Sequence, residues 1–148
     1  MVDKLLDFFP FLLLTTVRNM VKKINQIFAA QQIDLTGEQF AILNILSPDF
    51  NMGAEVSQQD IADFLDKGKS TILRGLDILE RKHYVQRRPK AKDRRVNLVV
   101  LTELGTAILM QARAVDFQFV NQVSARFDQR DFQGFKRILQ QINDACTE

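Results

Sequence analysis

Four consecutive segments in the middle of the chain constrain its fold more than any other feature. The segment "QQDIADFL" (58–65) has helical periodicity, "DKGK" (66–69) interrupts it, and the periodicity resumes over 70–82. The segments "YVQRR" and "VNLVVL" then have the composition of strands and are separated by a charged loop. Two short helices joined by a tight turn suggest a helix-turn-helix, and a hairpin directly after it makes a winged helix. The sequence therefore predicts a winged helix-turn-helix lobe.

Helical patterns also occupy both ends of the chain. Apolar residues recur every three or four positions over 5–28, which predicts a long amphipathic helix that Pro10 either starts or kinks. Thr102 can N-cap a helix running towards Ser124, and Asp131 lies near the start of a last helix. We therefore expect a mainly α protein with a small β-hairpin wing.

Start signals within the lobe place two further helix boundaries. The segment "TGEQ" (36–39) has the form of a capping box and opens a helix that should end before Pro48. Ser57 and Asp60 resemble a second N-cap pair. The segment 49–56, between Pro48 and Ser57, is predicted to be a loop. The 148 residues suit a single domain, in which the winged helix-turn-helix lobe covers 35–102 and a helical region is formed by 1–34 and 103–148.

Positive charge is concentrated in one short stretch. Between Arg81 and Arg95 there are eight Lys or Arg residues and one acid, Asp93, so this stretch carries +7. The whole chain carries only +2, which leaves −5 for the remainder. A cationic patch in an acidic remainder favours a polyanionic partner, double-stranded DNA first and an anionic membrane second. A merely solvated loop is the alternative.

A helical wheel over 70–82 separates two faces. Ile72, Leu76 and Leu79 fall on one side, which should be buried, with Leu73 on its flank. Small hydroxyls and cations at a helix N-terminus can bind phosphates and base edges. With the basic hairpin, this face gives the predicted DNA-binding residues: Lys67, Lys69, Ser70, Thr71, Arg74, Arg87, Arg88, Lys90, Lys92, Asp93, Arg94 and Arg95.

In this order and spacing, the motifs resemble the MarR family of bacterial winged-helix transcription regulators. The resemblance covers nearly the whole chain and rests on "LTGEQFAIL", "SQQDIADFL", "KSTILRGLDILERK", "DRR" (93–95) and "LTELG". It implies a homodimeric DNA-binding regulator, usually a repressor, often released by a small aromatic or anionic effector or by oxidation. It also implies wing roles for Asp93 and Arg95, with Arg94 as the alternative tip residue. We expect the Asp93 carboxylate to hold the Arg95 guanidinium in a fixed position.

At two positions in the lobe, the residue type is not the one that the expected backbone conformation favours. His83 stands where the family commonly has a glycine after the recognition helix, at a turn that should be left-handed. Gly75 lies inside the same helix, and close packing against a neighbouring element would explain it.

Phenylalanine placement favours a homodimer, in which 1–34 and 103–148 form the dimerisation region and 35–102 the DNA-binding lobe. Nine of the 12 Phe lie in the terminal helices: Phe8, Phe9, Phe11, Phe28, Phe117, Phe119, Phe127, Phe132 and Phe135. A partner's terminal helices would cover more of them than one chain can, although one larger intrachain core is the alternative.

Other functional classes find little support. One His, one Cys and no clustered metal ligands or phosphate-cradling glycine loop argue against an enzyme, a metal site or a cofactor. The single Cys146 excludes an internal disulfide and fits a reducing, cytoplasmic setting; it is more simply an inert thiol than a redox sensor. The apolar N-terminus contains Asp3, Asp7 and Pro10, so it resembles neither a signal peptide nor a membrane span. A winged helix that binds an acidic protein instead of DNA is the alternative function.

Overall fold

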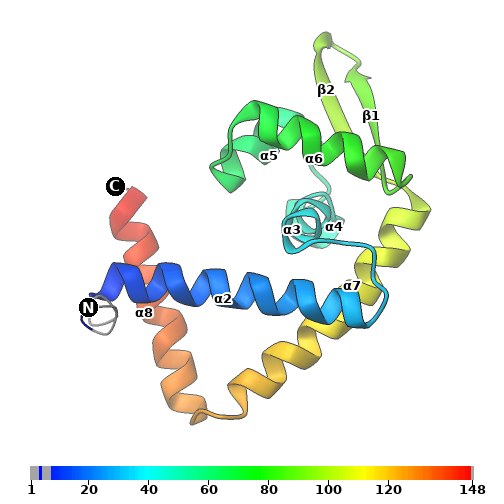
Figure 1. Ribbon diagram of the computed structural model, residues 1–148. Helices are drawn as coiled ribbons and strands as arrows, with labels where there is room; N and C mark the ends of the chain where they lie inside the picture. The colour runs from blue at the N-terminus through cyan, green and yellow to red at the C-terminus, as the bar shows by residue number, and fades with distance from the viewer. Residues whose placement is uncertain (1–3, 5–7, 148) are drawn as a thin grey trace. The chain divides into compact units, whose positions relative to one another are not determined.

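The computed structural model describes Lys4 and residues 8–147 and divides the chain into two compact units, Met1–Arg113 and Ala114–Glu148. The boundary between the two units lies inside a helix. The first unit has this order: α2 (Phe9–Ala30), α3 (Gly37–Ile45), α4 (Pro48–Asn51), α5 (Gln58–Leu65), α6 (Lys69–Arg81), β1 (Val85–Lys90) and β2 (Asp93–Leu101). Helix α7 (Glu103–Ser124) crosses the boundary, and α8 (Gln129–Thr147) follows in the second unit. The predicted mainly α fold with a hairpin wing is confirmed (Figure 1).

Local signals set the helix starts. Pro10 lies in the first turn of α2, so it starts the helix and does not kink it. Thr36 and Gln39 form the predicted capping box, with the Gln39 N–H donating to Thr36 Oγ1 at 3.2 Å. Ser57 and Asp60 form a second one. The loop expected over 49–56 is partly wrong, because Pro48 opens the short helix α4 there.

The core of the first unit joins α2, α3, α5, α6, α7 and the hairpin. Its fully buried side chains come from separate elements: Phe28, Ile42, Leu43, Ile61, Ile72, Leu76, Leu79, Val85 and Leu109. Phe28 packs edge to face on Phe40, with ring centroids 5.3 Å apart. Of the nine phenylalanines counted in the terminal helices, Phe28 is therefore already covered within its own chain by helix α3.

The hairpin pairs β1 with β2 in antiparallel register, from Val85–Leu101 to Pro89–Asn97. It projects beyond α5 and α6 (Figure 1). On the other edge of β2, the Val99 N–H donates to the Val56 carbonyl at 2.9 Å. The buried side chains of Val85 and Val99 anchor the hairpin to the core.

A tight joint connects α6, the hairpin and α7. His83 adopts a left-handed φ of 60°, as predicted, and the N–H groups of His83 and Tyr84 close the end of α6 by donating to Glu80 and Leu79 carbonyls. Thr102 Oγ1 accepts from the Gly105 N–H at 2.9 Å, which confirms the predicted N-cap of α7. A Cβ on Gly105 would lie 1.9 Å from the Tyr84 carbonyl oxygen, so only glycine permits this approach.

Candidate nucleic-acid interface

Helix α6 has the two faces that the wheel predicts. Ile72, Leu76 and Leu79 are buried, and Leu73 is 38% exposed on the flank. Its first residues, Lys69 and Ser70, are exposed, as is Arg74, whereas Thr71 is half-buried. The helix therefore presents a polar N-terminal surface while its apolar stripe holds it in the lobe.

Two residues near α6 differ from the expectation. Lys67 precedes the helix, because Gly68 is the N-cap, and its N–H donates to the Ala62 carbonyl at 3.0 Å. Gly75 is not required by close packing, because an added Cβ would meet Ile42 Cδ1 at 3.4 Å, an ordinary contact.

The tip of the hairpin contains a large β-bulge. Lys90 pairs with Asp93 and Pro89 pairs with Asn97, so Arg94, Arg95 and Val96 have no opposite residue on β1. A bulge of this kind re-aims the side chains that it contains. Arg94 and Arg95 are exposed, and neither forms an ion pair within the described residues. The two-residue turn Ala91–Lys92 is shorter than the charged loop expected from the sequence.

Asp93 shapes this bulge through the backbone. Its Oδ1 accepts a hydrogen bond from the Arg95 N–H at 3.0 Å, the pattern in which an aspartate stabilises a turn two residues on. The expected contact with the Arg95 guanidinium does not occur in this structure. The carboxylate therefore fixes the backbone that carries Arg95 and leaves the guanidinium free.

The guanidinium of Arg87 is paired with acids of the same chain. Its guanidinium donates to Glu80 Oε2 at 2.5 Å and to Asp77 Oδ1 at 2.6 Å, and its backbone N–H donates to Glu80 Oε1 at 3.1 Å. The side-chain hydrogen bond with Glu80 raises the pKa of Arg87, and the same bond lowers the pKa of Glu80. These contacts join β1 to the last turns of α6. Sequence reasoning did not single out Asp77 or Glu80, although both are acids on the helix that leads into the basic stretch.

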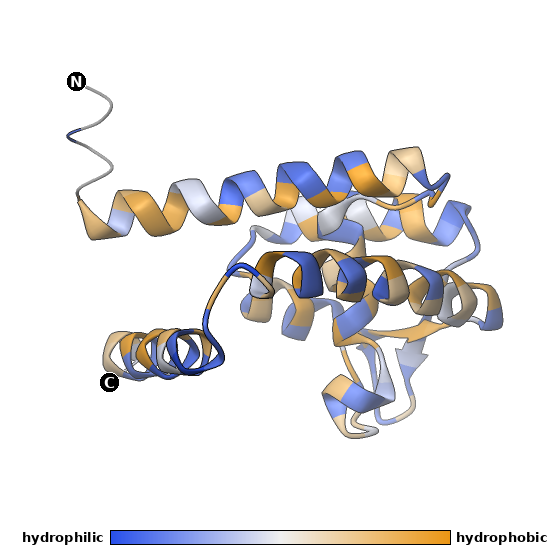
Figure 2. Cartoon of the chain, turned by 90° about the horizontal axis from the view of Figure 1, so that it is seen from below, coloured by the Kyte–Doolittle hydropathy of each residue, from blue (hydrophilic) through white to orange (hydrophobic). Residues whose placement is uncertain are grey.

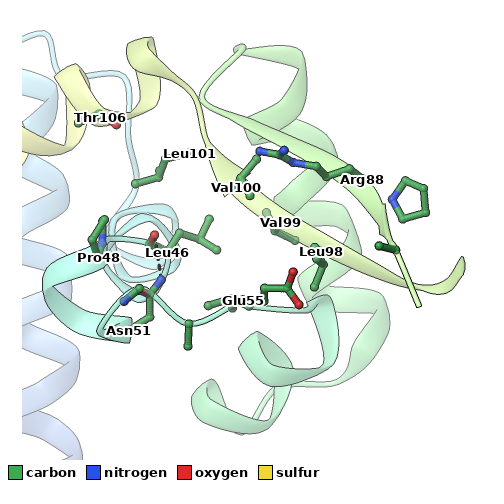
Figure 3. Close-up of a pocket in the computed structure, with 15 residues that line it drawn as sticks. Leu46, Pro48, Asn51, Glu55, Arg88, Leu98, Val99, Val100, Leu101 and Thr106 are labelled. Atoms are coloured by element: carbon green, nitrogen blue, oxygen red, sulfur yellow. Dashed lines mark hydrogen bonds between the residues drawn. The ribbon is translucent and has the colours of Figure 1, made fainter. Parts of the chain in front are cut away.

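A cleft of about 600 Å³ lies between β2 and the segment joining α4 to α5. Figure 3 shows Arg88 and Glu55 on opposite sides of it, with Leu98–Leu101 of β2 between them. Lys90 pairs with Glu55 across 3.5 Å. Arg88 therefore faces a different surface of the hairpin from Arg87.

The comparisons with known proteins agree with this geometry. Residues 35–105 match a family described as winged helix DNA-binding domain. A structure of S. aureus MepR in complex with DNA has a TM-score of 0.80 and 23% identity, covering 93% of this chain and 97% of that chain. A MarR-family transcriptional regulator from Rhodococcus sp. RHA1 has a TM-score of 0.79 and 21% identity, covering 92% of both chains.

The fold is that of the MarR family. The transcriptional regulator BldR from Sulfolobus solfataricus has the same MarR fold, with a TM-score of 0.75 and 24% identity over 95% of this chain and 97% of that chain. No curated protein sequence matches the chain. The surface formed by α6 and the hairpin lies within the matched winged-helix domain, residues 35–105.

Within Lys4 and residues 8–147, no group of His, Cys, Asp and Glu is arranged to hold a metal ion. Across the same part of the chain, no helix combines the length and hydropathy that crossing a membrane requires.

Proposed function

We propose that this chain is a MarR-family transcription regulator that binds double-stranded DNA as a homodimer. The observation that carries the proposal is the set of cations on the first two turns of α6 and at the hairpin tip with no ion-pair partner among the described residues: Lys69, Arg74, Lys92, Arg94 and Arg95. Surface cations that the protein leaves unpaired are available to phosphates and base edges. The resemblance supports repression as the regulatory outcome.

The two elements have different roles in this proposal. The N-terminal turns of α6 enter the major groove, where Arg74 can bind guanine O6 and N7 through two hydrogen bonds, while Ser70 and Thr71 contact phosphates or base edges. The bulge carries Arg94 and Arg95 towards the minor groove or its phosphates. Arg87 holds the hairpin against α6 and does not itself contact DNA.

Exposed apolar side chains at the start of α2 support the homodimer. Phe8, Phe9, Phe11, Leu12, Leu14 and Val17 are all at least 46% exposed. Figure 2 shows this half of α2 as largely hydrophobic, whereas its later turns alternate with polar residues. A contiguous apolar surface of this kind marks a protein contact. A two-fold dimer would bind a near-palindromic operator with half-sites about 34 Å apart.

Selection of bound sequences from random duplex DNA tests the proposal. Wild type should enrich a near-palindrome. Arg74→Ala should relax the preference at one position of each half-site, at a cost of about 1–3 kcal/mol for the preferred base. Arg95→Ala should weaken binding to all sequences more evenly. Wild-type selectivity and affinity in both variants would contradict these roles.

Salt dependence separates DNA binding from the alternative of a protein-interaction module. If a dimer contacts on the order of ten phosphates, log affinity should fall with log salt concentration at a slope near −9. If the chain is instead a protein-interaction module, it should bind an acidic protein and not duplex DNA. Failure to bind duplex DNA even at low salt would contradict the proposed function.

An effector belongs to the same proposal. We infer release from DNA by a small aromatic or anionic molecule from the resemblance alone, since no described residue is assigned to it. Titrating such compounds into the DNA complex and measuring the bound fraction tests this. An unchanged bound fraction across a broad set would count against it.

A further inference from the structure

Arg113 of α7 makes three side-chain hydrogen bonds to the segment that runs from α3 into α4. Its Nε donates to Asn44 Oδ1 at 2.8 Å, its NH2 group to Ser47 Oγ at 2.6 Å, and its NH1 group to Asp49 Oδ2 at 2.9 Å. One planar guanidinium therefore binds the last turn of α3, Ser47 of the connection and the first turn of α4 together.

The acceptors are themselves held in place. Asn44 Nδ2 donates to the Phe40 carbonyl at 2.9 Å, and Ser47 Oγ donates to the Asn44 carbonyl at 2.8 Å. Ser47 is only 3% exposed. These backbone hydrogen bonds orient the two acceptor oxygens towards the Arg113 guanidinium. Asp49 differs, since its side chain is 80% exposed.

Arg113 also has a special position along α7. Gly105, Leu109 and Ala112 form the buried face of this helix in the first unit. Arg113 flanks that face and is the last residue of the first unit, since Ala114 begins the second. A hollow of about 340 Å³, bordered by Pro48, Asp49 and Met110, lies on the same flank. Beside this hollow, the hydrogen bonds of Arg113 connect α7 to the segment from α3 to α4.

We propose that Arg113 is a positioning residue that sets the direction in which α7 leaves the DNA-binding lobe. The inference rests on the proposed homodimeric function, in which α7 connects the lobe to the dimerisation region. In such a dimer, the direction of α7 determines the separation of the two copies of α6. Arg113 thereby sets the half-site spacing that the protein accepts, without touching DNA.

Three variants remove different parts of the contact between Arg113 and the segment from α3 to α4. Arg113→Met keeps the aliphatic stem and removes all donors. Arg113→Lys keeps the charge but lacks the planar fork that reaches three acceptors. Asp49→Ala is the matched control, because it removes only the exposed partner, and exposed ion pairs contribute little. Each variant is first checked for a wild-type melting transition.

The main measurement is affinity for a series of duplexes in which the selected half-sites are moved apart or together by one or two base pairs. Wild type should discriminate strongly between spacings. Arg113→Met should reduce the ratio of affinities for preferred and shifted spacing by roughly 2- to 30-fold. Arg113→Lys should fall between, and Asp49→Ala should match wild type. Affinity for an isolated half-site should not change, whereas simple damage to the lobe would lower it.

The outcomes separate this inference from the proposed function. A wild-type protein that binds no duplex overturns the proposed function. If wild type binds with a spacing preference and Arg113→Met shows the same preference, the inference about Arg113 is overturned and the proposed function is not. If Arg113→Met does not fold, the Arg113→Lys series decides by the same criterion.

A second readout does not use DNA. A spin label at Gln59→Cys on α5, in a Cys146→Ser background, reports the distance between the two lobes of a dimer. Arg113→Met should broaden the distance distribution relative to wild type. An unchanged distribution would overturn the proposed positioning role.

Discussion

At the tip of the hairpin, the Asp93 carboxylate accepts a hydrogen bond from the Arg95 backbone N–H. Asparagine offers the same side-chain oxygen without the charge. Asp93→Asn should therefore keep DNA affinity within about twofold, whereas Asp93→Ala should lower it about fivefold, since a typical hydrogen bond contributes about 1 kcal/mol. Binding assays on a fixed operator measure this. Equal losses in both variants would instead support an ion pair with the Arg95 guanidinium.

Two glycines in the lobe should respond in opposite ways to alanine. Gly105→Ala would drive a methyl group into the Tyr84 carbonyl and should lower the free energy of unfolding by at least about 3 kcal/mol. Gly75→Ala meets only an ordinary contact in α6 and should raise that free energy by up to about 1 kcal/mol. Urea unfolding measures both. A destabilised Gly75→Ala would show that α6 needs the glycine for packing after all.

At the scale of elements, Arg87 and Glu80 connect the hairpin to helix α6. The pKa of Glu80 is lowered in the folded state by its hydrogen bonds with Arg87. A lowered pKa contributes stability that is fully present above the unfolded value, near 4.5, and is lost as the pH falls through the folded value. The joint between α6 and β1 should therefore weaken in acid.

Glu80→Gln tests this connection. At pH 7 the variant should unfold at lower urea concentration than wild type, and at an acid pH below the lowered folded pKa of Glu80 the difference should shrink, because wild type has then lost the same charge. Urea midpoints at the two pH values measure it. A difference that stays constant with pH would mean that the carboxylate charge of Glu80 does not carry the contact.

At the scale of the whole molecule, the start of α2 decides the oligomeric state in our proposal. Leu14 is 66% exposed, so Leu14→Lys should leave the fold of one chain intact. If α2 forms the dimer contact, this variant should raise the dimer dissociation constant by at least about 30-fold, as expected for loss of a central contact. Sedimentation velocity measures the change. Met52→Lys is the matched control, because Met52 is 93% exposed on the DNA-binding lobe and should leave the dimer unchanged.

The sequence by itself determined the features that act over a few residues. The capping boxes at Thr36 and Ser57 and the buried stripe of α6 follow from hydrogen bonds and periodicity within one element. The left-handed turn at His83 was expected from the family resemblance. The winged-helix fold followed from the order of such elements. The outward face of α6 could be predicted for the same reason, since burying Ile72, Leu76 and Leu79 leaves Arg74 facing out.

Only the tertiary structure decided which charged side chains remain free. Arg87 and Arg95 look alike in the sequence, yet Arg87 meets the acids of α6 while Arg95 extends from a bulge. Phe28 is buried because α3 folds back on it, and Arg113 finds acceptors on a segment more than 60 positions away in the chain. Such contacts depend on packing that brings separate elements together, and no local pattern encodes that packing.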